Sequence, residues 1–99
     1  MASHKSFATA LRRVRKARGL SQEAFSDVSS RTYLSSLERD LKSPTLNKVN
    51  ELAAVLDVHP LTLLSLGYGG DKPEDLIALL TQVQQELQSL AEPPSSTAT

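Results

Sequence analysis

The stretch from Gln22 to Arg39 reads QEAFSDVSSRTYLSSLER and contains the most informative pattern in the chain. It consists of two short amphipathic segments separated by a break that contains serines. Ser21 and Ser30 precede the two segments, and a serine hydroxyl in this position can accept a backbone N–H that a helix start leaves unpaired. The pattern therefore predicts two short helices that meet at a tight turn.

The second of these helices is expected to have two dissimilar faces. Leu34 and Leu37 lie at helical spacing on one face and suit a hydrophobic core. The opposite face carries short hydrogen-bonding side chains between two guanidinium groups, namely Arg31, Thr32, Ser35, Ser36 and Arg39. This composition is typical of a helix that lies in the major groove of DNA and contacts base edges.

Three segments carry a resemblance to a known family: LRRVRKARGLSQEAF at residues 11–25, SRTYLSSLER at residues 30–39 and SPTLNKVNELAAVLDV at residues 43–58. Their order and spacing resemble the helix-turn-helix of the Cro/CI-like, xenobiotic-response-element type regulators. The resemblance implies an all-α fold with a five-helix DNA-binding domain. A further helix is expected to follow this domain.

The resemblance also implies roles for individual residues. The position matched by Gln22 contacts a phosphate and the recognition helix, and an ion pair between Arg15 and Glu38 ties the first helix to the third. The predicted base-contacting residues are Ser30, Arg31, Thr32, Ser35 and Ser36. The predicted phosphate-contacting residues are Gln22, Arg39, Lys42, Asn47 and Lys48. Of these, Asn47 and Lys48 are expected at the exposed start of a helix, where backbone N–H groups can also bind a phosphate.

The sequence departs from the family pattern at two places. Only Val28 and Ser29 separate Asp27 from Ser30, so the turn is about two residues short and lacks its usual glycine. Asp40 stands where the family usually has a glycine after Glu-Arg. A helix that ends there requires a left-handed residue, which Asp tolerates less well than Gly but better than most residues do.

The helices around this motif are predicted from hydrophobic spacing. The first is expected at about residues 6–18 and ends at Gly19, while the short helix from Gln22 is expected to bury Ala24, Phe25 and Val28. After the recognition helix, Leu41 is expected to pack beneath the core. A helix capped by Thr45 should bury one stripe, which consists of Leu46, Val49, Leu52, Ala53 and Leu56. The next helix opens at Pro60, and residues 67–70 (GYGG) are expected to form a flexible break.

A C-terminal helix is predicted from about Asp71 to Leu90 or Ala91, where Pro93 stops it. Its apolar residues recur at spacings of four and three, which is the seam of a short coiled coil. These predicted dimerisation residues are Leu76, Leu80, Val83, Leu87 and Leu90. The predicted organisation is therefore a DNA-binding domain at residues 1–68, a dimerisation helix at 71–92 and a disordered tail at 93–99.

The net charge of zero conceals an asymmetry along the chain. Residues 1–60 contain ten basic and six acidic side chains, a net charge of +4, whereas residues 61–99 contain one basic and five acidic side chains, a net charge of −4. This distribution suits a protein whose first part meets a polyanion, although a solvated surface without such a role fits the composition equally well.

Several kinds of chemistry lack their usual residues. The chain has no cysteine, and neither His4 nor His59 has a carboxylate at metal-ligand spacing, so we expect no metal, cofactor or catalytic residue. His59 is expected to be a helix-entry residue. Tyr33 could either pack on the core or reach a phosphate, and the core role is favoured. No apolar run is long enough for a signal peptide or a membrane span, so a cytoplasmic location is expected.

We therefore predict a sequence-specific transcriptional regulator, more a repressor than an activator, that binds a palindromic operator as a homodimer. Double-stranded DNA is its predicted partner, and a regulatory protein is a second candidate partner. Two alternatives stay open at this point. One is a DNA-binding antitoxin that also binds a toxin protein, and the other is a protein-interaction adaptor that does not bind DNA.

Overall fold

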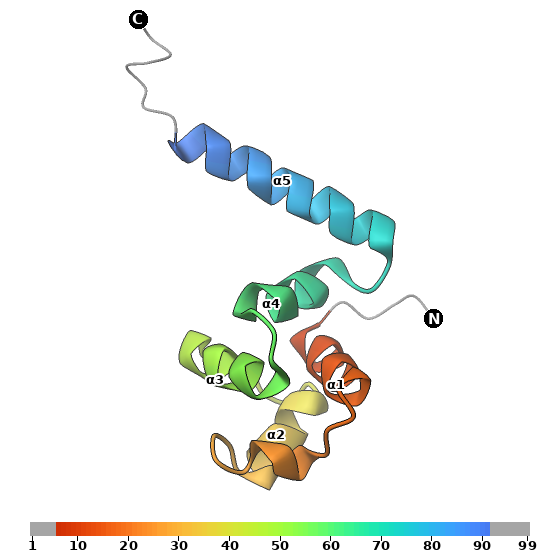
Figure 1. Ribbon diagram of the computed structural model, residues 1–99, viewed down its shortest axis with the longest axis vertical. Helices are drawn as coiled ribbons and strands as arrows, with labels where there is room; N and C mark the ends of the chain where they lie inside the picture. The colour runs from red at the N-terminus through yellow and green to blue at the C-terminus, as the bar shows by residue number, and fades with distance from the viewer. Residues whose placement is uncertain (1–5, 92–99) are drawn as a thin grey trace, which may run out of the picture.

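The computed structural model describes residues 6–91, and this part of the chain is entirely helical apart from its connections. Figure 1 shows the shorter helices gathered at one end of the molecule and the long C-terminal helix at the other. In chain order the elements are α1 (Phe7–Ala17), the 3-10 helix η1 (Gln22–Phe25), α2 (Arg31–Glu38), α3 (Leu46–Leu56), α4 (Pro60–Gly69) and α5 (Pro73–Ala91). The all-α prediction of five helical elements followed by a C-terminal helix is confirmed. The predicted tail at 93–99 lies outside the described residues.

The first two elements lie close to their predicted positions, with one difference in type. α1 starts one residue later than predicted because Ser6 is its N-cap, and Ser6 Oγ accepts from the Thr9 backbone N–H at 3.2 Å. Gly19 follows the helix with φ 70°, as a left-handed terminus requires. The segment from Gln22 is a 3-10 helix of four residues rather than an α-helix, and Ser21 makes no side-chain cap bond.

The short η1 changes which of its residues reach the core. Phe25 is fully buried, but Ala24 is exposed, so the prediction that Ala24 is buried was wrong. Three residues per turn and only four residues in all give this element too short a face to bury several side chains. The brief turn from Ser26 to Ser29 then leads directly into the recognition helix.

The recognition helix α2 begins and ends as its sequence predicts. The Tyr33 backbone N–H donates to Ser30 Oγ at 3.0 Å, which makes Ser30 the N-cap. Asp40 has φ 62°, so it takes the left-handed conformation in place of the family's glycine. The chain turns outward at this residue, and Leu41 is 60% exposed instead of packing beneath the core as predicted.

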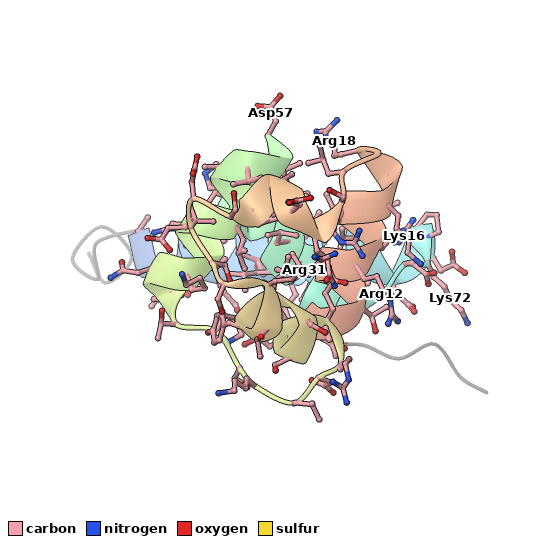
Figure 2. All side chains as sticks on the ribbon, turned by 90° about the horizontal axis from the view of Figure 1, so that it is seen from below. Arg12, Lys16, Arg18, Arg31, Asp57 and Lys72 are labelled. Atoms are coloured by element: carbon pink, nitrogen blue, oxygen red, sulfur yellow. The ribbon has the colours of Figure 1, made fainter. Side chains whose placement is uncertain are left out.

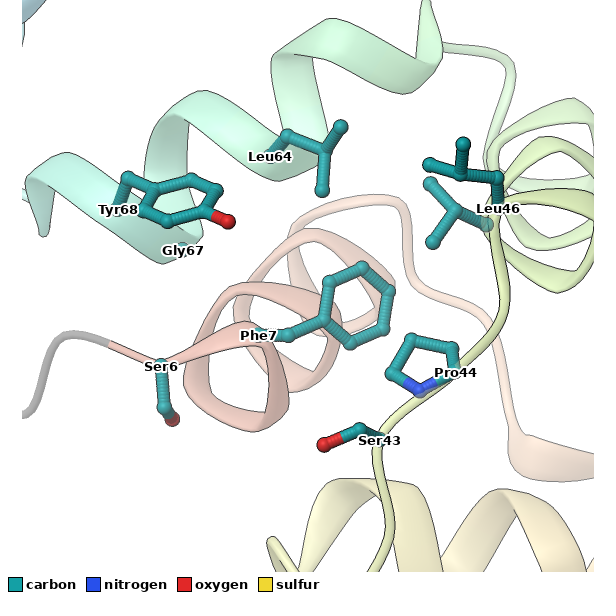
Figure 3. Close-up of a pocket in the computed structure, with 9 residues that line it drawn as sticks. Ser6, Phe7, Ser43, Pro44, Leu46, Leu64, Gly67 and Tyr68 are labelled. Atoms are coloured by element: carbon teal, nitrogen blue, oxygen red, sulfur yellow. The ribbon is translucent and has the colours of Figure 1, made fainter.

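α3 is capped as expected, although its first apolar residue lies outside the core. Thr45 Oγ1 accepts from the Lys48 backbone N–H at 3.1 Å. Leu46 is 74% exposed, which corrects its predicted place in the buried stripe. It is the first residue of the helix, and Figure 3 shows it beside a pocket that it lines together with Phe7 and Pro44.

α4 continues through the segment that was predicted to be a flexible break. Gly67, Tyr68 and Gly69 are helical, so α4 ends at Gly69 and the flexible break predicted at residues 67–70 was wrong. The glycines permit close packing of neighbouring helices. A Cβ on Gly67 would lie 3.3 Å from the Phe7 Cα, and one on Gly69 would lie 3.0 Å from a Leu76 methyl carbon.

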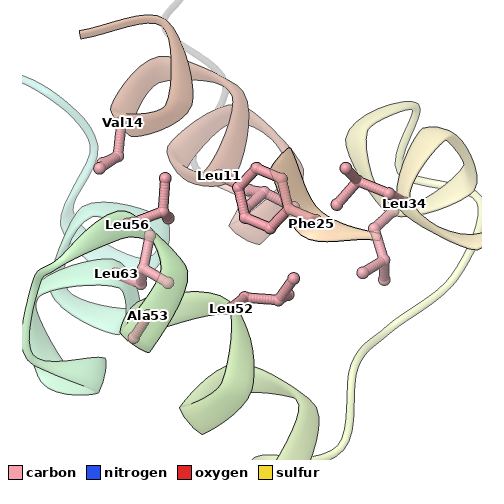
Figure 4. Packing of buried hydrophobic residues seen from close by; sticks show 9 residues of the cluster. Leu11, Val14, Phe25, Leu34, Leu52, Ala53, Leu56 and Leu63 are labelled. Atoms are coloured by element: carbon pink, nitrogen blue, oxygen red, sulfur yellow. The ribbon is translucent and has the colours of Figure 1, made fainter. Parts of the chain in front are cut away.

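The hydrophobic core lies between α1, η1, α2, α3 and α4 (Figure 4). Its large, fully buried side chains are Phe25, Leu11, Leu34, Leu37, Leu52, Leu56 and Leu63. Since each of the five elements contributes at least one of these residues, the core fixes the position of α2 relative to its neighbours.

α5 packs mainly on α4 and then extends away from the other helices (Figure 1). Every residue from 80 to 91 is exposed. No single helix in the described part of the chain is long and apolar enough to span a membrane; α3 and α4 reach that length only together, and they meet at 106°.

Candidate nucleic-acid interface

The polar face of α2 forms a shallow, open depression together with η1. It is lined by Gln22, Arg31, Thr32, Ser35, Ser36 and Arg39. Of the predicted base-contacting residues, only Ser30 is absent from this lining, because its hydroxyl caps the helix. In Figure 2 the molecule is seen from the end opposite α5, and Arg31 lies near the middle of that end. The depression therefore presents short polar side chains and two guanidinium groups to the solvent.

Arg31 and Thr32 occupy the first turn of α2 and are exposed. The Arg31 side chain makes no hydrogen bond or ion pair with any other residue between 6 and 91. A free guanidinium at the start of a helix is suited to a bidentate contact with the O6 and N7 atoms of guanine. Ser35 and Ser36 are half-buried one turn further along and offer shorter hydrogen-bonding groups.

Arg15 and Glu38 fix α2 from its inner side, and the structure brings them together as the resemblance implied. Arg15 Nε donates to Glu38 Oε2 at 2.6 Å and Nη2 donates to Oε1 at 2.9 Å, which is a bidentate pair. Arg15 Nη1 also donates to the Leu20 carbonyl oxygen at 2.9 Å. The Glu38 side chain is only 4% exposed. The hydrogen bonds that Arg15 donates to the Glu38 carboxylate raise the pKa of the Arg15 guanidinium above its ordinary value.

Gln22 joins this buried pair to the outer surface. Its Nε2 donates to Glu38 Oε1 at 3.1 Å, and the residue also lines the depression. An amide nitrogen has two donor hydrogens, so one remains for a phosphate oxygen after Glu38 has accepted the other. The bond to Glu38 thus sets the orientation in which the Gln22 amide faces the surface.

Lys48 has a different place from the exposed one that was predicted. Its side chain is 23% exposed, and its Nζ donates to the carbonyl oxygen of Val28 in the helix-turn-helix turn. The same ammonium group lies 2.9 Å from Glu51 Oε1 and 5.6 Å from the centre of the Tyr33 ring. Lys48 thus connects α3 to the turn and to α2, and its ammonium group would have to leave Val28 to reach a phosphate.

The remaining predicted phosphate-contacting residues are exposed, and of these Arg39 lines the depression. Arg39 and Lys42 are exposed at the end of α2 and on the following loop, and Asn47 is exposed in the first turn of α3. Lys42 Nζ lies 5.9 Å from the centre of the Tyr33 ring. Tyr33 itself is partly buried and packs against the core, which supports its structural role over a phosphate contact.

Sequence reasoning missed a structural role for Arg18. Its Nε donates to the Leu56 carbonyl oxygen at 2.9 Å and its Nη2 donates to the Asp57 carbonyl oxygen at 3.0 Å. It therefore satisfies carbonyl groups that the end of α3 leaves unpaired. Figure 2 shows Arg18 beside Asp57, whereas Arg12 and Lys16 project from another side of α1. No local pattern could have revealed this contact, since the partners are 38 and 39 residues apart.

A model of the helix-turn-helix family HTH_3 matches residues 11–63. The chain belongs to this family. The matched segment begins in α1, includes η1 and α2, and ends in α4. A search of curated proteins and a search of solved structures gave no match.

Membership of the HTH_3 family assigns the chain a DNA-binding domain that acts in transcription regulation, and such domains are not enzymes. The depression on α2 therefore belongs to the element that faces DNA in a helix-turn-helix protein. Residues 6–91 contain no group of three or more histidine, aspartate and glutamate side chains that could hold a metal ion.

Proposed function

We propose that this HTH_3 protein is a repressor that binds a palindromic operator as a homodimer. The observation that carries the proposal is the polar surface of α2, where Arg31 and Thr32 are exposed beside Ser35 and Ser36. An operator-bound dimer can repress by occupying the site, which requires no contact with the transcription machinery.

The proposed contacts divide into two kinds with different consequences. Arg31, Thr32, Ser35 and Ser36 contact base edges and select the sequence, while Gln22, Arg39, Lys42 and Asn47 contact phosphates and supply affinity. Ser30 is left out of the first group because its hydroxyl caps α2. Lys48 is left out of the second group because its ammonium group is held by Val28 and Glu51.

The homodimer is supported by the apolar stripe on α5. Leu80, Val83, Leu87 and Leu90 are between 40% and 82% exposed, although their spacing is that of a helix seam. Leu76 is half-buried because it packs beside Gly69 of α4. A twofold axis would let each stripe face its equivalent and would place two recognition helices on half-sites about 34 Å apart. We also propose a cytoplasmic location, because the proposed ligand is DNA.

The proposal can be tested by selecting bound duplexes from a random pool and then titrating salt. We expect an enriched inverted repeat, and a fall in affinity with salt whose slope corresponds to several phosphate contacts. Absence of binding to any duplex at low salt would refute DNA binding by this chain.

The dimer is tested separately with the double substitution Leu80→Glu and Leu87→Glu. Both side chains are more than half exposed, so the variant should remain folded. We expect it to sediment as a monomer and to bind a half-operator as weakly as a whole operator. A double variant that still sediments as a dimer would show that α5 is not the interface.

A further inference from the structure

The exposed apolar surface is not confined to the stripe on α5, because α4 contributes to it. Two adjoining depressions lie between α4 and α5, and Leu61, Ser65 and Leu80 line both of them. One also contains Tyr68 and Val83. We call the surface formed by these five residues the α4–α5 groove. Leu61 is 62% exposed and Tyr68 is 77% exposed, although both are large apolar side chains on a helix that also carries the buried Leu63.

The amount of exposed apolar surface is that of an interface. Seven of the exposed large apolar residues lie on these two helices: Leu61, Tyr68, Ile77, Leu80, Val83, Leu87 and Leu90. Summed over the seven residues, the exposed area is on the order of 800 Å², which is comparable with the share of each partner in a standard interface. The groove and the stripe are therefore expected to be covered together.

The scarcity of charged side chains on α5 favours a partner whose surface is uncharged. Between Leu76 and Ala91 the only charged side chain is Glu86, and its carboxylate accepts a hydrogen bond from Gln82 at 3.1 Å within the same helix. The other polar residues of this segment are threonine, glutamine and serine. Two copies of α5 can therefore approach each other with little repulsion between like charges, whereas a strongly charged partner would find no complement.

The direction of packing follows from the position of the groove. In Figure 1 the first half of α5 lies above α4 and the second half leads away from it. The groove lies beside the first half and the middle of α5, which contribute Leu80 and Val83. If two α5 helices packed in parallel, Leu87 and Leu90 would cover their own equivalents and leave Leu61 and Tyr68 exposed. If they packed antiparallel, the second half of each helix would lie over the groove of the other copy.

We infer that two copies pair with their α5 helices antiparallel, so that Leu87 and Leu90 of each copy fill the α4–α5 groove of its partner. This inference rests on the proposed homodimer and specifies how it is built. It makes Leu61 and Tyr68 of α4 part of the interface, which would otherwise consist of α5 alone. It also explains why the second half of α5 extends without a cover in a single copy.

The first test compares two substitutions of exposed leucines in the full chain by sedimentation equilibrium. Leu61→Glu places a charge in the groove, whereas Leu41→Glu places the same charge on the loop after α2, at a leucine that is 60% exposed and lines neither depression. We expect Leu61→Glu to raise the dimer dissociation constant at least tenfold and Leu41→Glu to change it less than twofold. If the two substitutions change the dimer dissociation constant equally, the groove is not part of the interface. That result would refute the inference but not the proposed homodimer.

The second test uses the absence of cysteine from the chain. Ser65→Cys places a thiol in the groove, and Leu90→Cys places one near the end of α5. In an antiparallel dimer, oxidation of an equimolar mixture of the two variants should give a disulfide-linked heterodimer, while Leu90→Cys alone should give little covalent dimer. Efficient linkage of Leu90→Cys to itself would show parallel packing and refute the inference. A wild-type chain that is monomeric at all accessible concentrations would refute both the inference and the proposed homodimer.

Discussion

Replacing Glu38 with alanine should destabilise the domain strongly, because the carboxylate is held in a nearly closed site. Its side chain is 4% exposed, and it accepts hydrogen bonds from Arg15 Nε and Nη2 and from Gln22 Nε2. The Arg15 side chain is 13% exposed and would be left without its counterion. Removing one partner of a buried ion pair typically costs about 3–5 kcal/mol.

This loss is large relative to the stability of a small domain, which is about 5–10 kcal/mol. For a domain of this size it corresponds to a fall in melting temperature of about 15–30 °C. Urea denaturation followed by circular dichroism measures the change in the free energy of unfolding. A loss below about 1 kcal/mol would refute the argument, since it would show that Arg15 recovers its solvation without Glu38.

A double replacement separates the cost of an unpaired charge from the value of the pair. Arg15→Met with Glu38→Leu removes both charges and keeps similar volumes, and such replacements are often neutral or stabilising. We expect the double variant to be at least about 2 kcal/mol more stable than Glu38→Ala.

The raised pKa of Arg15 also makes a prediction about the pH dependence of stability. Its contribution to stability is fully present below the unfolded pKa of an arginine and is lost only as pH rises through the higher folded value, so this group should add no pH dependence between pH 6 and 9.

Three further predictions concern α2 and the segments around it. Arg31→Ala should cost about 1–3 kcal/mol in binding to the selected operator and relax the preference at one base position, and uniform weakening across all duplexes would instead identify a phosphate contact. Lys48→Met should destabilise the domain by about 1–2 kcal/mol, because the Val28 carbonyl oxygen loses a charged hydrogen-bond donor. Lys42→Met, in contrast, should leave the melting temperature unchanged and weaken DNA binding at every sequence. Asp57→Gly should stabilise the domain by about 0.5–1 kcal/mol in urea denaturation, since Asp57 has φ 59°, and a loss of stability would count against strain at this residue.

The features that sequence analysis predicted correctly depend on neighbouring residues. The caps Ser30 and Thr45 each bond to an N–H three residues later, so spacing alone suffices to predict them. The left-handed conformation of Asp40 follows from the end of the helix before it. The Arg15–Glu38 pair spans 23 residues and was predicted only because the family resemblance supplied it.

The wrong prediction of a break at residues 67–70 concerns a place where neighbouring helices approach each other closely. Gly67 and Gly69 were read as a break because glycine is a poor helix former. In the structure, Phe7 and Leu76 pack so close to α4 that any larger side chain would crowd them. Glycine at these two positions therefore suits close packing of neighbouring helices, which local propensity does not describe.

The orientation of α2 at the candidate interface also depends on contacts between residues that are distant in the sequence. A turn without glycine and about two residues shorter than usual left open how α2 would be oriented. The structure resolves this with contacts on two sides, because Lys48 holds the Val28 carbonyl oxygen and the Arg15–Glu38 pair holds the C-terminal end of α2. Both ends of the helix are thus fixed by residues that lie outside its polar face. Arg31, Thr32, Ser35 and Ser36 take no part in these contacts, and under the proposed function they contact the bases. The geometry that presents them depends on Lys48, Arg15 and Glu38.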